Sequence, residues 1–270
     1  MTENKNPRAL MIGAHPDDCE FKTSGTTIKM VEKGFIIKYV SLTNGETGHF
    51  NKGGGEVALI RKDEAKAVGK LAGIEYDVFD IKSNGITADI ATRERVICLI
   101  REFKPDMIFT HRPNDYHPDH RTVSTLVQDS SYAIQVPNVC PLTPCLRYSP
   151  VIFYMYDGFT KPNPFIPDVV IDIDSAIKTK TDILNCHKSQ VYEWLPWIDG
   201  YEVPENDADR LKWLHNRLTE RDGKVADTYR KMLVNKYGEK GNEIKCAEAF
   251  EVCEYSRRPA DNEIEWLFPF

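Results

Sequence analysis

Short apolar runs alternate with amphipathic stretches along the first half of the chain. Buried strands are typically short and continuously apolar, whereas helices that cover a sheet carry apolar residues at intervals of three and four. Strand-like and helix-like segments alternate as 9–14, 26–32, 35–42, 56–71, 76–81, 96–103 and 106–111. This alternation predicts an α/β fold with a Rossmann-like, mostly parallel sheet and helices on both faces.

The second half of the chain is less regular. Strands are expected at residues 151–157 and 168–173, followed by helices at 175–190 and 208–236. The proline-rich segment 136–145 is interpreted as an ordered loop, because the strands on either side would be needed for one sheet. We therefore predict a single domain, with its core at residues 1–190 and a C-terminal extension at residues 191–270 packed on that core.

Composition narrows the classes of function. The 270 residues carry a formal net charge of -6 and no cluster of Lys or Arg, which disfavours a nucleic-acid partner. The apolar runs are strand-sized, whereas a bilayer helix needs about 20 apolar residues, so we expect no membrane span. The N-terminus lacks the apolar segment of a secretory signal, and the seven cysteines form no CxxC pair. A cytoplasmic protein with reduced thiols and a small-molecule partner is the expectation.

Polar loops directly follow three of the strand-like runs. They are HPDDCE (15–20), TNGETGH (43–49) and HRPNDYHPDHR (111–121), and the last holds three of the seven histidines. In open parallel sheets, ligands bind beyond the carboxyl ends of the strands. These loops are therefore the expected position of a functional site.

The first of these loops places two carboxylates side by side. Asp17 and Asp18 repel each other unless a cation lies beside them. A catalytic zinc takes three protein ligands and leaves a fourth position for water, so His15 and Asp18 could supply two ligands and a histidine of the later loop the third. Successive side chains of an extended backbone point in opposite directions. One aspartate would then bind the metal, and the other would act as general base on the water.

AHPDDCE (14–20) followed by HPDH (117–120) resembles the LmbE/PIG-L family of metal-dependent de-N-acetylases. Residues 61–73, 186–190 and 248–257 look like further segments of that family, so the resemblance spans most of the chain. It implies hydrolysis of the N-acetyl group of an N-acetylglucosamine-type sugar or glycoside. The implied cofactor is Zn²⁺, and Fe²⁺ also suits two histidines and one carboxylate.

The resemblance also implies roles for individual residues. Asp17 would be the general base, and His117 would stabilise the oxyanion or protonate the leaving amine, with Asp119 as its electrostatic partner. The implied metal ligands are His15, Asp18 and His120.

Arg61 and Asn84 are the substrate contacts that the resemblance implies. Many relatives have an Asp-Gly turn where this chain has Asn84-Gly85, so the contact at Asn84 departs from the family pattern. From the sequence alone, Arg61 could equally be an exposed helix residue paired with Asp63 or Glu64.

Other side chains are interpreted structurally. His111 has no counterpart in the family motif and is expected to be a buried, hydrogen-bonded histidine, and helix capping is favoured for His187. Packing in the core or between subunits of a homo-oligomer is favoured over sugar stacking for three aromatic residues, Tyr192, Trp194 and Trp197.

Two alternative functions remain open at this stage. The first is hydrolysis of another amide or an ester, because an activated water does not specify the acyl group. The second is a non-catalytic protein of the same fold that binds a metal or a sugar.

Overall fold

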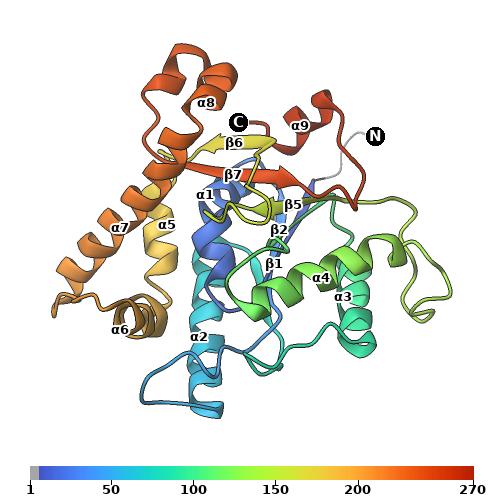
Figure 1. Ribbon diagram of the computed structural model, residues 1–270, viewed down its shortest axis with the longest axis horizontal. Helices are drawn as coiled ribbons and strands as arrows, with labels where there is room; N and C mark the ends of the chain where they lie inside the picture. Colours follow the sequence, from blue (N-terminus) through green and yellow to red (C-terminus); the bar gives the residue numbers. More distant parts are fainter. Residues whose placement is uncertain (1–5) are drawn as a thin grey trace.

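The computed structural model describes residues 6–270, which are built around one seven-stranded sheet with the order β3-β2-β1-β4-β5-β7-β6 (Figure 1). The first five strands of this order run parallel, and β7 is antiparallel to both of its neighbours. The strands are β1 (Arg8–Gly13), β2 (Ile36–Ser41), β3 (Glu75–Val78), β4 (Met107–Thr110), β5 (Val151–Met155), β6 (Val169–Asp172) and β7 (Ala247–Val252). The predicted mostly parallel α/β fold is confirmed.

Helices cover both faces of the sheet (Figure 1). Strand β1 shows why: Ala9 and Met11 belong to one buried cluster, and the intervening Leu10 and Ile12 belong to the other. Alternate side chains of a strand point to opposite faces, so a strand that is apolar throughout needs cover on both sides. The helices are α1 (Asp18–Glu32), α2 (Gly55–Ala72), α3 (Ile90–Phe103), α4 (Pro118–Ala133), α5 (Ile177–Leu184), α6 (Leu195–Asp199), α7 (Asp207–Thr228), α8 (Arg230–Tyr237) and α9 (Asp261–Leu267). Helix α1, with α5 beside it, lies on one face, and α3 and α4 lie on the other.

Helix α1 lies very close to the sheet at Gly25. A Cβ atom at this position would meet the side chain of Ile173 at 2.7–2.9 Å, which is too close for any larger residue without movement. This helix begins at Asp18, well before the predicted start at residue 26. Its first turns are rich in Thr, Ser and Gly, which are weak helix formers, so burial against the sheet stabilises them instead.

Several predicted elements differ in extent from those observed. The helix expected at residues 175–190 ends at Leu184 and is followed by a π-helical turn, η1 (Ser189–Trp194). The helix expected at residues 208–236 is divided into α7 and α8 at Tyr229.

Residues 191–270 do more than pack on a finished core. Strand β7 lies between β5 and β6, and the expected boundary at residue 190 falls inside the π-helical turn. Glu248 on β7 forms a 2.8 Å ion pair with Lys180 of α5 and accepts hydrogen bonds from the backbone N–H groups of Gly25 and Thr26 in α1. Lys180 is fully buried and also pairs with Asp222 of α7 at 2.8 Å. The last 80 residues are therefore integral to the sheet.

Within residues 6–270, no helix combines the length and the apolarity that crossing a bilayer requires.

Candidate metal centre and active site

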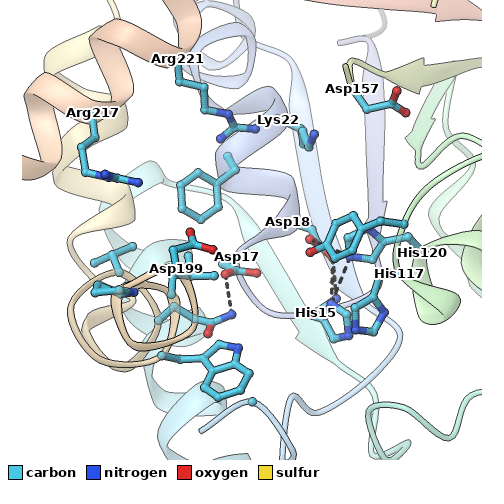
Figure 2. Close-up of a pocket in the computed structure, with 18 of the residues that line it drawn as sticks. His15, Asp17, Asp18, Lys22, His117, His120, Asp157, Asp199, Arg217 and Arg221 are labelled. Carbon is cyan, nitrogen blue, oxygen red and sulfur yellow. Dashed lines mark hydrogen bonds and ion pairs between the residues drawn. The ribbon is translucent and has the colours of Figure 1, made fainter. Parts of the chain in front are cut away.

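The functional loops of the sequence meet at the carboxyl ends of β1 and β4. These strands are neighbours in the sheet, but the chain continues from β1 to β2 on one side and from β4 to β5 on the other. Such a reversal of strand order opens a crevice in parallel sheets. Here a cleft of about 670 Å³ lies over it, lined by both loops and by residues of α1, α6 and α7 (Figure 2).

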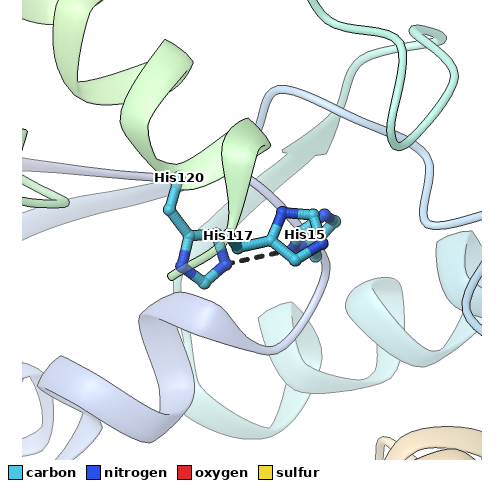
Figure 3. Close-up of side chains that lie close together, drawn as sticks. All are labelled: His15, His117 and His120. Atoms are coloured by element: carbon cyan, nitrogen blue, oxygen red, sulfur yellow. Dashed lines mark hydrogen bonds between the residues drawn. The ribbon is translucent and has the colours of Figure 1, made fainter. Parts of the chain in front are cut away.

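The three predicted metal ligands converge in this cleft (Figure 2), and Figure 3 shows two of them, His15 and His120, beside His117. His15 Nδ1 lies 3.3 Å from His120 Nε2, Asp18 Oδ1 lies 3.3 Å from His120 Nε2, and Asp18 Oδ2 lies 3.5 Å from His15 Nδ1. Ligand atoms about 2.0–2.1 Å from a tetrahedral zinc would be roughly 3.3 Å apart. The spacing of the two imidazole nitrogens matches this value, and each lies close to one oxygen of Asp18.

Further carboxylates orient both imidazoles. Asp119 bonds to His15 Nε2 at 3.0 Å, and Asp115 bonds to His120 Nδ1 at 3.0 Å. Burial lowers the pKa of both rings, but the surrounding carboxylates more than offset it and raise the pKa of His15 to about 9 and that of His120 to about 10. Carboxylate–histidine pairs of this kind are typical around metal ions, because they fix the tautomer and orientation of the ligand. The loops thus form an environment that favours a positive charge.

His111 is buried beside this centre. Its Nε2 accepts a 3.1 Å hydrogen bond from the backbone N–H of Ala14, and its ring stacks on His120 with centroids 4.0 Å apart. Burial lowers its pKa to about 4, so the ring is neutral. The geometry agrees with the expected buried, hydrogen-bonded histidine, which also lies 3.2 Å from Asp18. Among residues 6–270, two groups of side chains have ligand atoms close enough together to hold a metal ion: Asp18, His111 and His120, and His15, His117 and His120.

Asp17 and Asp18 face different directions because the backbone turns sharply between them. Asp17 has a φ of 129°, a conformation that residues other than glycine rarely adopt and that is concentrated at functional sites. Its carboxyl accepts a 2.5 Å hydrogen bond from Gln190 Nε2 (Figure 2). Burial and the nearby charge of Asp18 raise the pKa of Asp17 to about 7.

The support beneath Asp17 was not identified from the sequence. Gln190 belongs to the π-helical turn, a distortion often found at functional sites. Just before it, buried His187 contacts Glu20 of α1 at 2.5 Å rather than capping α5, so the capping interpretation was wrong. Glu64 of α2 accepts hydrogen bonds of 2.7 and 2.6 Å from the Ser189 backbone N–H and hydroxyl. The one sequence signal was the family-like segment 186–190.

His117 stands at the N-cap of α4. Its Nδ1 accepts a 3.1 Å hydrogen bond from the backbone N–H of Asp119, so the proton of the neutral ring lies on Nε2. Burial and the neighbouring His15 and His120 lower the pKa of His117 to about 4. The Asp119 carboxylate is hydrogen-bonded to His15, and its negative charge acts on the His117 ring in the direction that raises the pKa, as expected of an electrostatic partner.

The two expected substrate contacts lie in different surroundings. Arg61 is only 1 % exposed and donates from Nη2 to the carbonyl of Gly48 at 2.8 Å, so the interpretation as an exposed helix residue was wrong. Asn84 lines the cleft, and its side chain donates to Thr47 Oγ1 at 2.8 Å while its backbone N–H donates to Asp119 at 2.7 Å. Their contacts with a substrate remain predictions.

The three aromatic residues of the π-helical region divide between core and cleft. Tyr192 is buried in a cluster with Leu214, whereas Trp194 lines the cleft and stacks on Trp197 with centroids 5.5 Å apart. Packing is thus observed for Tyr192.

Comparisons with known proteins identify relatives that cover most of the chain. A diacetylchitobiose deacetylase of Thermococcus kodakarensis is 26% identical over 212 residues, covering 72% of this chain and 76% of that protein. A 4-oxalmesaconate hydratase of Pseudomonas putida is also 26% identical, over 195 residues that cover 69% of this chain and 75% of the relative.

Among solved structures, an N,N'-diacetylchitobiose deacetylase from Pyrococcus horikoshii shares the fold, with a TM-score of 0.71 at 22% identity over 92% of this chain and 84% of that one. Residues 10–131, which contain both motifs, match the family model described as PIG-L, GlcNAc-PI de-N-acetylase. The resemblance to the LmbE/PIG-L family that the two motifs indicated is therefore confirmed.

Proposed function

We propose that the protein hydrolyses the N-acetyl group of an N-acetylglucosamine-type sugar or glycoside, with a divalent metal held by His15, Asp18 and His120. The metal would be Zn²⁺, with Fe²⁺ as the alternative. The observation that carries this proposal is the convergence of the His15, Asp18 and His120 side chains, with 3.3–3.5 Å between their nearest polar atoms, beside a separate buried carboxyl, Asp17. A bound divalent ion would polarise the acetyl carbonyl and acidify a water molecule.

Asp17 is the general base in this mechanism. Its carboxyl faces the cleft, held by Gln190, and takes a proton from the attacking water as the C–O bond forms. The proton on His117 Nε2 is available for a hydrogen bond to the tetrahedral oxyanion.

Asp17 also delivers the proton that the leaving amine needs. The neutral ring of His117 holds one proton, and its Nδ1 is occupied by the N–H of Asp119, so Asp17 is the better proton donor. When the C–N bond breaks, acetate and a free amine leave, and Asp17 returns to its starting state. Asp119 acts by orienting His15 in this account, and Arg61 and Asn84 contact the sugar.

Turnover of a substrate panel tests the proposal. N-acetylglucosamine glycosides and diacetylchitobiose should release free amine, and acetyl-lysine peptides should not. Release should stop on chelation and return with added Zn²⁺. Robust deacetylation of peptides, with none of any amino sugar, would reject the proposed substrate class.

A second candidate reaction is hydration of an unsaturated polycarboxylate. It is supported by the hydratase relative, which is as similar in identity as the deacetylase, and the same general base could activate water for addition to a double bond. Incubation with 4-oxalmesaconate, followed by its absorbance, distinguishes the two reactions. Loss of absorbance without amine release from any sugar would favour hydration.

A further inference from the structure

The cleft has a second charged region on the side opposite the metal-ligand loops. Lys22 of α1 and two arginines of α7, Arg217 and Arg221, line the same cleft as His15 and Asp18 (Figure 2). We refer to these three side chains as the cationic wall. The mechanism above uses none of them.

The cationic wall has no carboxylate of its own. Among residues 6–270, no carboxylate oxygen lies within 4.0 Å of a side-chain nitrogen of these three residues. Lys22 Nζ donates to the backbone carbonyl of Tyr156 at 2.7 Å. Both guanidinium groups lie over aromatic rings, that of Arg221 4.9 Å from the ring centre of Phe21 and that of Arg217 3.8 Å from that of Tyr201. Their hydrogen-bond donors are therefore not consumed by an ion pair.

Most acidic side chains of the cleft are engaged elsewhere. Asp157 pairs with Arg112 at 2.8 Å, and Glu220 pairs with Lys224 at 2.8 Å. Asp17, Asp18 and Asp115 belong to the metal centre described above. Asp199, at the end of α6, also lines the cleft but lies beyond ion-pair distance of the wall. The positive charges of the wall therefore lie near carboxylates but form no ion pair with them.

The positively charged side chains of the wall lie close to one another. Burial and the nearby charge of Arg221 lower the pKa of Lys22 to about 8, although the charges of Asp157, Asp115 and Asp18 act in the opposite direction. Gathering cations around a partly desolvated cleft is unfavourable unless an anion binds between them. Arginine in particular presents a planar fork of N–H donors that matches carboxylate, sulfate and phosphate oxygens.

We propose that the cationic wall is a subsite for an oxyanion group on the substrate, a carboxylate, sulfate or phosphate carried by the part of the molecule remote from the N-acetyl group. The substrate class is then an acidic N-acetylated saccharide, such as one in which N-acetylglucosamine is joined to a uronic acid. This inference rests on the proposed function for the position of the acetyl group at the metal centre.

Selectivity between matched substrates provides the main test. The measurement is kcat/KM for a neutral N-acetylglucosamine disaccharide and for analogues that carry a carboxylate, a sulfate or a phosphate on the second ring. At least one anionic analogue should be preferred by about tenfold or more, the usual worth of a hydrogen bond to a charged group. The analogue that is preferred shows whether the subsite binds a carboxylate, a sulfate or a phosphate. Ratios near one for all three analogues would overturn the subsite while leaving deacetylation intact.

Substitutions in the cationic wall test whether its side chains cause the preference for the anionic analogue. Arg217→Gln and Arg221→Gln should each lower the preference for the anionic analogue, chiefly by raising KM, and Arg221→Lys should retain part of it. Lys224→Gln is the matched control, because Lys224 lines the same cleft but is exposed and paired with Glu220. A preference that persists in both arginine variants, with normal melting curves, would place the anion elsewhere and overturn the proposal.

Binding separates the subsite from the reaction. Methyl glucuronoside and inorganic sulfate should bind the wild-type protein in calorimetry more tightly than they bind Arg217→Gln. If no N-acetyl sugar is turned over but this difference is seen, the proposed function fails and the subsite stands. Equal binding of both anions to the two proteins would reject the subsite whatever the outcome of the turnover assay.

Discussion

The two halves of the chain contribute to the cleft in different ways. The first half supplies the proposed metal ligands and the proposed base from two short loops, residues 15–18 and 117–120. The second half supplies Gln190 beneath Asp17 and, from α7, the two arginines of the cationic wall. The proposed reactive groups thus lie in two short segments of the chain. The groups that support the base and line the rest of the cleft come from separate elements far apart in the sequence.

This difference follows from what each group must do. Metal ligands must converge to within about 3–4 Å, and a tight loop achieves this with few residues. A supporting contact or a substrate wall needs only a side chain at the right place on a packed element, so any element brought to the rim can provide it. Substitutions at the site loops of the first half should therefore mainly reduce metal binding and turnover. Substitutions in the second half should mainly alter stability and substrate selectivity.

The largest effect is expected from loss of the metal. Chelation, or substitution of His15 or His120 by Ala, should reduce metal content from about one ion per chain to near zero and turnover to background, as elemental analysis and amine release would show. His117→Ala is the matched control, since it should retain the ion while losing activity. Loss of the ion in His117→Ala as well as in His120→Ala would instead favour a ligand group made of His15, His117 and His120.

Asp17→Asn should lower turnover by about a hundredfold to ten-thousandfold, the usual worth of a positioned general base, with metal content nearly unchanged. Added zinc should not restore its activity. Asp18→Asn should weaken metal binding and recover in part when zinc is in excess. A metal-free Asp17→Asn protein rescued by zinc would show that the two roles are exchanged.

Lys180→Met tests the packing role of the second half. It leaves Asp222 and Glu248 buried without their cation, so the free energy of unfolding should fall by about 3–5 kcal/mol. Denaturant unfolding measures the loss, and the folded protein should keep its metal. Lys224→Met removes an exposed ion pair and should leave the unfolding midpoint unchanged. Equal midpoints for the two variants would show that the buried triad does not stabilise the fold.

Gln190→Ala should have the smallest effect on catalysis, a decrease in turnover of about tenfold. The hydrogen bond from Gln190 favours the ionised form of Asp17, so its loss should raise the pKa of Asp17 above its value of about 7. Activity that depends on ionised Asp17 would then appear at higher pH. The acidic limb of the profile of kcat/KM against pH should therefore shift to higher pH. An unshifted limb would mean that Gln190 does not act through Asp17.

The fold of the first half and the two loops that carry the proposed ligands could be predicted from the sequence, because each is specified by residues that are close together along the chain. Apolar runs followed by turns defined β1, β2 and β4, and His15 and Asp18 lie three residues apart. Their convergence with His120 required only that the ends of two parallel strands meet at one edge of the sheet.

Tertiary structure decided the remaining features. Strand β7 is antiparallel and lies between two strands that precede it by about 75 residues or more, so its place in the sheet has no local signature. Asp119 binds His15 across 104 positions, and Gln190 reaches Asp17 across 173. Such contacts depend on how whole elements pack, and a side chain's neighbours along the chain do not specify them. Local chemistry therefore determined which residues could react, and long-range packing determined what holds them and what faces them across the cleft.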